Sequence, residues 1–180
     1  HHAYFDRGAG YCIFNDLVVC AHEAISQGLS RILILDLDVH QGDGTASMLK
    51  DTPETFTFSA HCEKNFPFRK QLSDLDIPLP ERMEDDAYLA EVLPRLDAVL
   101  QSFDPELVLF QAGVDPLGSD HLGRLCLTRE GLNERNHAVY EAILGAGIPM
   151  VVTMGGGYSR PIERSVEAHI DVFQSLSTFS

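Results

Sequence analysis

The stretch Asp36-Leu37-Asp38-Val39-His40, which follows the apolar run 32–35, decides the fold class of this chain. The apolar run has the continuous hydrophobic pattern of a β-strand that is covered on both faces. Side chains two residues apart point to the same side of a strand, so Asp36, Asp38 and His40 begin on one face. Carboxylates and a neutral imidazole together favour zinc or a similar divalent ion over calcium or magnesium, which prefer oxygen ligands. The alternative is that both aspartates cap a following helix or bind turn amides.

The composition is typical of a globular domain. At 180 residues, with 44% hydrophobic and 22% charged residues, the chain is long enough for one domain with its own core. It has no apolar run of the ~20 residues that a membrane span needs and no secretory start, so we expect a cytoplasmic protein without membrane contact. The cysteines show no C-x-x-C spacing, which favours free thiols in a reducing compartment. They are Cys12, Cys20, Cys62 and Cys126.

The net charge of −14 bears on the partners of the protein. Binding to phosphate groups requires clustered lysine and arginine, which this sequence lacks, so direct binding to nucleic acid is not expected. An acidic surface attracts cationic partners such as lysine-rich peptides or polyamines. The same acidity also serves simply to keep a protein soluble.

Strand and helix patterns alternate along the chain. Strands are predicted at 31–35, 55–60, 107–110 and 150–154, and helices at 11–27, 45–50, 84–103, 129–145 and 161–175. Pro94 is expected to bend the third helix or to mark its first turn. This alternation predicts right-handed β-α-β units and a mostly parallel sheet, which binds ligands at the carboxyl ends of its strands. Four polar clusters, at 36–43, 59–61, 115–120 and 155–158, follow predicted strands, so we expect them to form one site.

A catalytic zinc ion needs about three protein ligands and an open position for water. Asp38 and His40 supply two of them. Asp115, which follows the third predicted strand, is the best candidate for the third, although an aspartate before a proline also starts turns. His61 is a rival ligand, but a single histidine at a strand end is more often a structural group.

A hydrolase also needs groups that move protons and stabilise an oxyanion. The imidazoles of His1 and His2 can handle protons if a carboxylate orients each, and Asp36 and Asp43 are free for that role. Two histidines at the start of a chain are otherwise a remnant of a purification tag. Tyr158, carried on three glycines, can place its hydroxyl on the oxyanion, although such glycines also form plain turns or phosphate-binding loops.

Several ordered motifs together resemble the zinc-dependent histone deacetylases and their bacterial deacetylase-like relatives. The motifs are His1-His2-Ala3, Arg7-Gly8-Ala9-Gly10-Tyr11-Cys12, Asp36-Leu37-Asp38-Val39-His40-Gln41-Gly42-Asp43-Gly44, Ala112-Gly113-Val114-Asp115, Asp120-His121-Leu122-Gly123 and Gly155-Gly156-Gly157-Tyr158. Gln41, where many members have a second histidine, and the loop 118–125 look closer to the class IV branch than to class I. The resemblance runs over nearly the whole chain and argues against the tag interpretation.

The resemblance implies a three-layer arginase/deacetylase-like α/β fold and a zinc-dependent amidohydrolase that removes acetyl groups from lysine side chains or polyamines. It implies zinc bound by Asp38, His40 and Asp115. It also implies that His2 is the general base and His1 an electrostatic group. Asp36 then orients His1 and does not touch the zinc, Asp43 lies behind the same pair, and Tyr158 stabilises the oxyanion.

The resemblance further implies an acyl-lysine channel lined by Gly10, Tyr11 and Phe66. Main-chain oxygens around Asp36, Asp38 and His40, together with Ser59 and Ala60, are implied to hold a structural monovalent cation such as potassium. Members of the family carry a substantial segment before the histidine pair. We therefore expect residues 1–180 to be the C-terminal portion of a longer catalytic domain, completed by that segment or by a homo-oligomer.

Two other functions compete with deacetylation. A magnesium-dependent phosphatase would use Asp36 as nucleophile and Asp38 as acid, and would leave His40 and Asp115 without roles. A binding module of the same fold would show no turnover. Zinc bound by Asp38, His40 and Asp115 argues against the first, and turnover of an acetyl-lysine reporter argues against the second.

Overall fold

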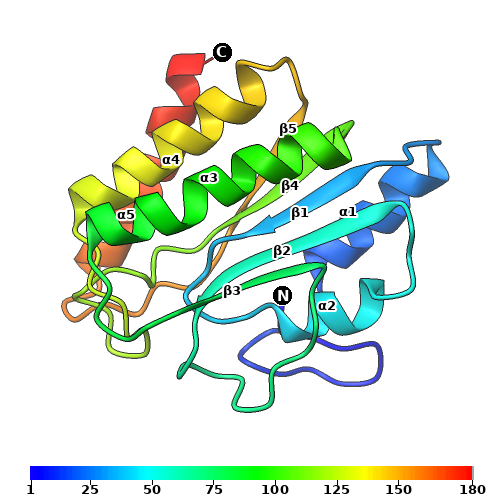
Figure 1. The fold of residues 1–180 in the computed structure, drawn as a ribbon. Coiled ribbons are helices and arrows are strands. Elements are labelled where there is room, and N and C mark those ends of the chain that lie inside the picture. The colour runs from blue at the N-terminus through cyan, green and yellow to red at the C-terminus, as the bar shows by residue number, and fades with distance from the viewer. Residues whose placement is uncertain (180) are drawn as a thin grey trace.

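The structure, a computed structural model, describes residues 1–179 and has a five-stranded parallel sheet at its centre (Figure 1). The strand order is β3-β2-β1-β4-β5, and all four neighbouring pairs are parallel. The strands are β1 (Ile32–Asp36), β2 (Thr55–Cys62), β3 (Leu75–Leu79), β4 (Leu107–Ala112) and β5 (Met150–Met154). The prediction of a mostly parallel sheet is therefore confirmed.

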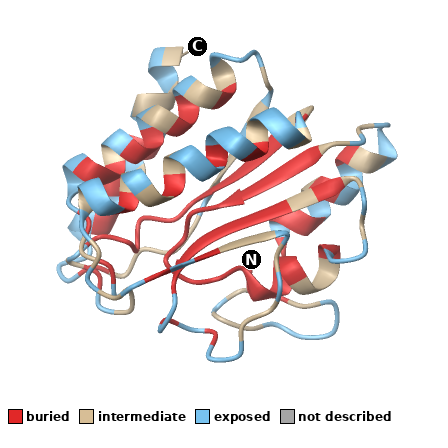
Figure 2. Ribbon diagram, viewed as in Figure 1, coloured by how far each residue is buried: buried red, intermediate tan, exposed pale blue. Residues whose placement is uncertain are grey.

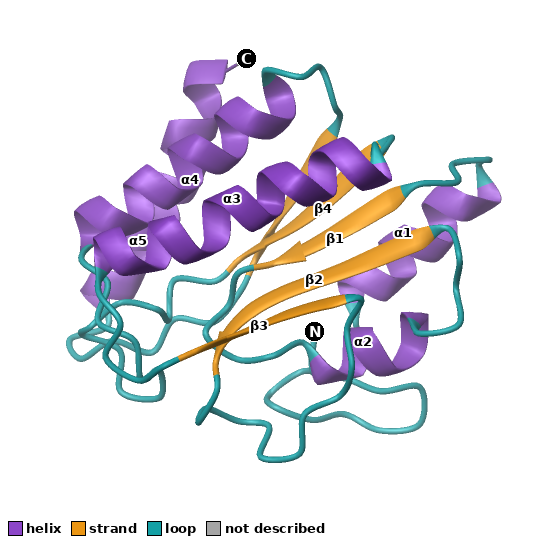
Figure 3. Cartoon of the chain, viewed as in Figure 1, coloured by secondary structure: helices purple, strands orange, loops and turns teal. Residues whose placement is uncertain are grey.

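Helices cover both faces of this sheet, which gives three layers (Figure 3). The helices are α1 (Asp16–Ser26), α2 (Asp43–Leu49), α3 (Asp85–Phe103), α4 (Arg129–Leu144) and α5 (Glu163–Leu176), followed by a 3₁₀ turn, η1 (Ser177–Phe179). Helices α1 and α2 lie on one side, and α3, α4 and α5 on the other (Figure 1). None of the helices within residues 1–179 is long and apolar enough to cross a membrane.

The central strand β1 is buried along its whole length (Figure 2). Leu33 and Leu35 point into the larger apolar cluster, which includes residues of α3, α4 and α5. Ile32 and Ile34 point the other way, into a smaller cluster with α1. Both faces of the strand are thus covered, which is why its sequence is continuously apolar.

Strand β3 was not predicted, and the expectation of four strands is wrong. Its sequence carries Asp76 and Pro78, both of which are disfavoured in strands. A proline is tolerated at the edge of a sheet because no strand on that side needs its missing N–H. The strand forms because Ile77 and Leu79 are buried against the core beside β2.

Helix α1 begins five residues later than predicted. Gly10 and Tyr11 have positive φ angles of 51° and 66°, so the chain turns there instead of starting a helix. Asn15 is the N-cap, and its side chain accepts a hydrogen bond from the Val18 amide. Phe14, which was expected on the buried stripe, is 83% exposed.

Other boundaries differ less. Strand β2 continues to Cys62, so the cluster 59–61 lies inside the strand and not after it. Pro94 lies in the interior of α3 and not in its first turn. Thr128 caps α4 as predicted, by accepting a hydrogen bond from the Gly131 amide. The four cysteines are free, although only Cys62 is fully buried.

Candidate active site

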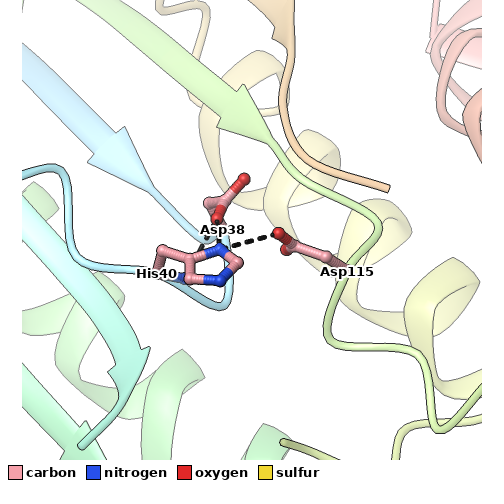
Figure 4. Close-up of side chains that lie close together, drawn as sticks. All are labelled: Asp38, His40 and Asp115. Carbon is pink, nitrogen blue, oxygen red and sulfur yellow. Dashed lines mark hydrogen bonds and ion pairs between the residues drawn. The ribbon is translucent and has the colours of Figure 1, made fainter. Parts of the chain in front are cut away.

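Asp38, His40 and Asp115 converge at the carboxyl ends of β1 and β4 (Figure 4). The Nδ1 atom of His40 lies 3.0 Å from Asp38 Oδ1 and 3.0 Å from Asp115 Oδ2. One ligand atom from each residue lies within 4.8 Å of the other two. All three side chains are buried. The strand-end rule therefore brings together the residues that the sequence analysis selected as metal ligands.

Backbone amides hold the two carboxylates in place. Gly156 N donates to Asp38 Oδ2 at 2.7 Å, and Val39 N donates to Asp115 Oδ1 at 2.8 Å. The other oxygen of each carboxylate faces His40. A Cβ atom at Gly156 would lie 2.1 Å from Asp115 Oδ2, so only glycine allows this close approach.

The charges of the cluster fit a divalent cation. Burial and the neighbouring charge of Asp38 raise the pKa of Asp115 to about 7. Burial opposes ionisation of Asp38, but the positive charge of His1 and the hydrogen bond from His40 keep its pKa well below the usual range. Carboxylate oxygens and imidazole nitrogens are zinc ligands, and three protein ligands leave one position open, as catalytic zinc sites do. The residues therefore fit zinc.

Two histidine–aspartate pairs lie beside the cluster. His1 Nδ1 is 2.6 Å from Asp36 Oδ2, and His2 Nδ1 is 2.7 Å from Asp43 Oδ1. The two imidazole rings are 4.0 Å apart. Tyr4 donates its hydroxyl hydrogen to the other oxygen of Asp43. Asp36 is bound to His1 and is not part of the group Asp38, His40 and Asp115.

The two imidazoles differ in charge. Burial alone would lower the pKa of His1, but the carboxylates of Asp36 and Asp38 outweigh burial and raise it to about 10. Burial lowers the pKa of His2 despite its hydrogen bond to Asp43. Near neutral pH, His1 is therefore a cation and His2 a neutral base whose Nε2 is free to accept a proton.

The predicted channel residues line one cavity of about 400 Å³. Its walls include Gly10, Tyr11 and Phe66, together with His2 and Tyr158. The Phe66 ring meets the His2 ring edge-on at 4.9 Å. Burial and the nearby carboxylates keep the pKa of Tyr158 well above its ordinary value, so its hydroxyl stays protonated.

The remaining predicted residues lie one strand away. Ser59 is the register partner of Asp36 across β1 and β2, and both Ser59 and Ala60 are buried. Ser59 Oγ lies 3.0 Å from His61 Nδ1. His61 is not part of the group of Asp38, His40 and Asp115.

Asn65 is a site residue that the sequence analysis missed. It is buried, its Oδ1 accepts from Arg124 N at 3.0 Å, and its Nδ2 donates to Leu122 O at 2.7 Å. The same Nδ2 lies 3.3 Å from His40 Nε2. Lys70 donates to the main-chain oxygen of Asn65 at 2.7 Å. An asparagine in a predicted loop looks like an ordinary turn residue, so its spacing gave no signal.

The comparisons with known proteins agree with this geometry. The sequence model of the histone deacetylase domain matches residues 1–173. An uncharacterized protein of Picosynechococcus sp. is 48% identical over 170 residues, which are 94% of this chain and 57% of that protein. Histone deacetylase 2 of Arabidopsis thaliana is 31% identical over 175 residues, covering 95% of this chain and 45% of the relative.

The solved structures give the same result. A crystal structure of an HDAC homolog from Aquifex aeolicus superposes with a TM-score of 0.85 and 29% identity, over 98% of this chain and 50% of that one. The predicted arginase/deacetylase-like fold is thus confirmed, and nothing in the comparisons supports the phosphatase alternative. The chain spans about half the length of the relatives it matches. By sequence and by structure, it belongs to the histone deacetylase family.

Proposed function

We propose that the complete protein is a zinc-dependent deacetylase that hydrolyses N-acetyl amides of lysine side chains. The observation that carries this proposal is the buried group Asp38, His40 and Asp115 beside two imidazoles, one protonated and one neutral. Zinc bound there would polarise the amide carbonyl and lower the pKa of a coordinated water toward ~7.

The proton steps follow from the two histidine–aspartate pairs. Asp43 accepts the Nδ1 hydrogen of His2, which leaves Nε2 to take a proton from the attacking water and to deliver it to the leaving amine. His1 keeps its proton because of Asp36, and its positive charge stabilises negative charge that develops beside it. Tyr158, whose hydroxyl stays protonated, donates a hydrogen bond to the oxyanion.

The cavity supports a slender substrate. Phe66 and Tyr11 are aromatic residues of its wall, and His2 and His40 line the same cavity. An acyl-lysine side chain combines an apolar stem with a polar amide at its tip, which suits a cavity that has both apolar and polar lining residues. An acetylpolyamine has a similar tip and is the second candidate substrate.

Two finer assignments belong to the same proposal. A potassium ion held by main-chain oxygens near Asp36, with Ser59 and Ala60 on the neighbouring strand, would stabilise the end of β1, and the register of β1 and β2 supports this position. The class IV branch is supported by Gln41, which is fully buried and binds Gln71 and Asp76.

The test is a panel of acetyl-lysine peptides, longer acyl-lysines and acetylpolyamines, assayed on the complete protein with metal analysis of the same sample. We expect zinc near one equivalent and turnover that falls at least about 10²-fold in Tyr158→Phe, since removal of one oxyanion donor has that effect. Asp115→Ala should lose zinc. Tyr140→Phe, a buried tyrosine on α4 away from the cavity, is the matched control. Bound zinc without turnover of any substrate would instead favour a binding module.

A further inference from the structure

Arg135 on α4 is fully buried directly behind the metal cluster. Its Nη1 donates to two main-chain oxygens, Leu37 O at 3.1 Å and Gly113 O at 3.0 Å. Its Nε and Nη2 both donate to Asn136 Oδ1, at 3.1 and 2.9 Å. The guanidinium carbon lies 5.9 Å from the centre of the Phe110 ring.

This environment is unusual for a buried charge. Buried arginines are normally paired with a carboxylate, because removing a charge from water is costly. Within residues 1–179, no aspartate or glutamate lies within ion-pair distance of Arg135. The guanidinium instead donates four hydrogen bonds to neutral oxygens. Two of them go to main-chain oxygens, so the planar group holds the backbone in place.

The two main-chain oxygens belong to the segments that carry the metal ligands. Leu37 O is part of the peptide bond that leads into Asp38, at the end of β1. Gly113 lies two residues before Asp115, at the end of β4, and packs so tightly that a Cβ atom there would lie 2.6 Å from Asp38 Oδ2. One nitrogen of Arg135 therefore bridges the two strand ends whose aspartates face His40.

We propose that Arg135 is a positioning residue that fixes the spacing of the Asp38 and Asp115 strand ends and so tunes the affinity of the site for its metal. This inference rests on the metal site of the proposed function. Arg135 touches neither substrate nor ligand side chains, so it acts only through the backbone. The alternative is an arginine that merely packs in the core and contributes to folding.

The direction in which zinc affinity changes when Arg135 is replaced distinguishes a positioning role from a purely electrostatic one. A buried cation near a metal site repels the metal, so its removal by charge alone should strengthen zinc binding. Loss of ligand positioning should weaken it. Partners that orient metal ligands typically change metal affinity about 10- to 100-fold when they are removed.

The experiment measures zinc affinity of the complete protein by competition with a chromophoric chelator. We expect Arg135→Met to bind zinc about 10- to 100-fold more weakly and excess zinc to restore its turnover. Arg135→Lys keeps the charge but cannot span both strand ends and Asn136, so it should also be weakened. Tyr140→Phe is the control, because it removes a buried hydrogen bond from α4 to Val172 O on α5 and none to either strand end.

A second readout is the visible spectrum of the cobalt-substituted protein, which reports ligand geometry and should change in Arg135→Met but not in Tyr140→Phe. If Arg135→Met does not fold, Arg135→Lys and Asn136→Ala decide the matter in the same assays. Zinc affinity that is unchanged or higher in the folded variants would overturn the proposal. Failure of the wild-type protein to bind zinc would instead overturn the proposed function.

Discussion

Substitution of Gly156 by alanine should separate metal binding from folding. The new Cβ atom would lie 2.1 Å from Asp115 Oδ2 and 3.0 Å from Asp38 Oδ2, the first of which is far inside contact distance. Either the aspartate or the 155–157 loop must move by roughly 1 Å, and disturbing the groups that orient metal ligands typically lowers metal affinity about 10- to 100-fold. Overpacking of this kind also destabilises a fold by about 1–3 kcal/mol.

The assay compares Gly156→Ala with Gly118→Ala. A Cβ atom at Gly118 would meet its nearest neighbour at 3.4 Å, an ordinary contact, so this control changes the same residue type without crowding. Chelator competition should show zinc affinity reduced about 10- to 100-fold in Gly156→Ala and unchanged in the control. Thermal unfolding of both metal-free variants measures the cost to the fold. Wild-type zinc affinity in Gly156→Ala would refute the reasoning.

Three further outcomes follow from the structure. Hydrogen bonds from Arg129 lower the pKa of Asp171. They therefore stabilise the fold at pH values above the pKa that Asp171 has in the unfolded chain, and this stabilisation is lost as the pH falls. Asp171→Asn should therefore lower the free energy of unfolding by about 1 kcal/mol at pH 7, with no difference in strong acid, as measured by denaturant titration. Burial lowers the pKa of His2, so the acid limb of kcat/KM should lie below pH 6.5, and a limb above pH 7 would contradict this role. Lys70→Met removes two hydrogen bonds to the loop that carries Phe66, which should raise KM about 3- to 10-fold with little change in kcat. Substitution of the exposed Lys50 by methionine should change neither constant.

The strand-end residues could be predicted because their pattern is local. A continuous apolar run followed by Asp38 and His40 identifies a buried strand and its end, and the parallel-sheet rule then places Asp115 beside them. The rule works because all three residues follow the carboxyl ends of parallel strands, which lie at the same edge of the sheet.

Other features depend on contacts that a local pattern does not contain. Strand β3 has a weak strand sequence and forms because β2 offers an edge to pair with. The start of α1 is set by the turn at Gly10 and by the Asn15 cap, which override the apolar spacing that begins earlier. Tertiary contacts therefore outweighed local propensity at both places.

The role of Arg135 could be predicted only in part. It occupies the buried stripe of α4, between Leu132 and Val139, where a charged residue is exceptional. That position was visible in the sequence and marks Arg135 as unusual. Its partners were not visible, because Leu37 and Gly113 bind it through main-chain oxygens, which no side-chain pattern reveals.

The Asp38, His40 and Asp115 group also has a consequence for how the protein unfolds. His40 meets Asp115 across 75 residues of sequence, and Asp38 meets the Gly156 amide across 118. No single hairpin or helix pair contains the site, so local unfolding at the end of β1 or at the end of β4 disassembles it. A ligand that binds only the native state stabilises it by about 1.4 kcal/mol for each tenfold excess over its dissociation constant. Zinc would therefore join β1, β4 and the loop after β5 into one cooperative unit, and slow hydrogen exchange throughout all three together.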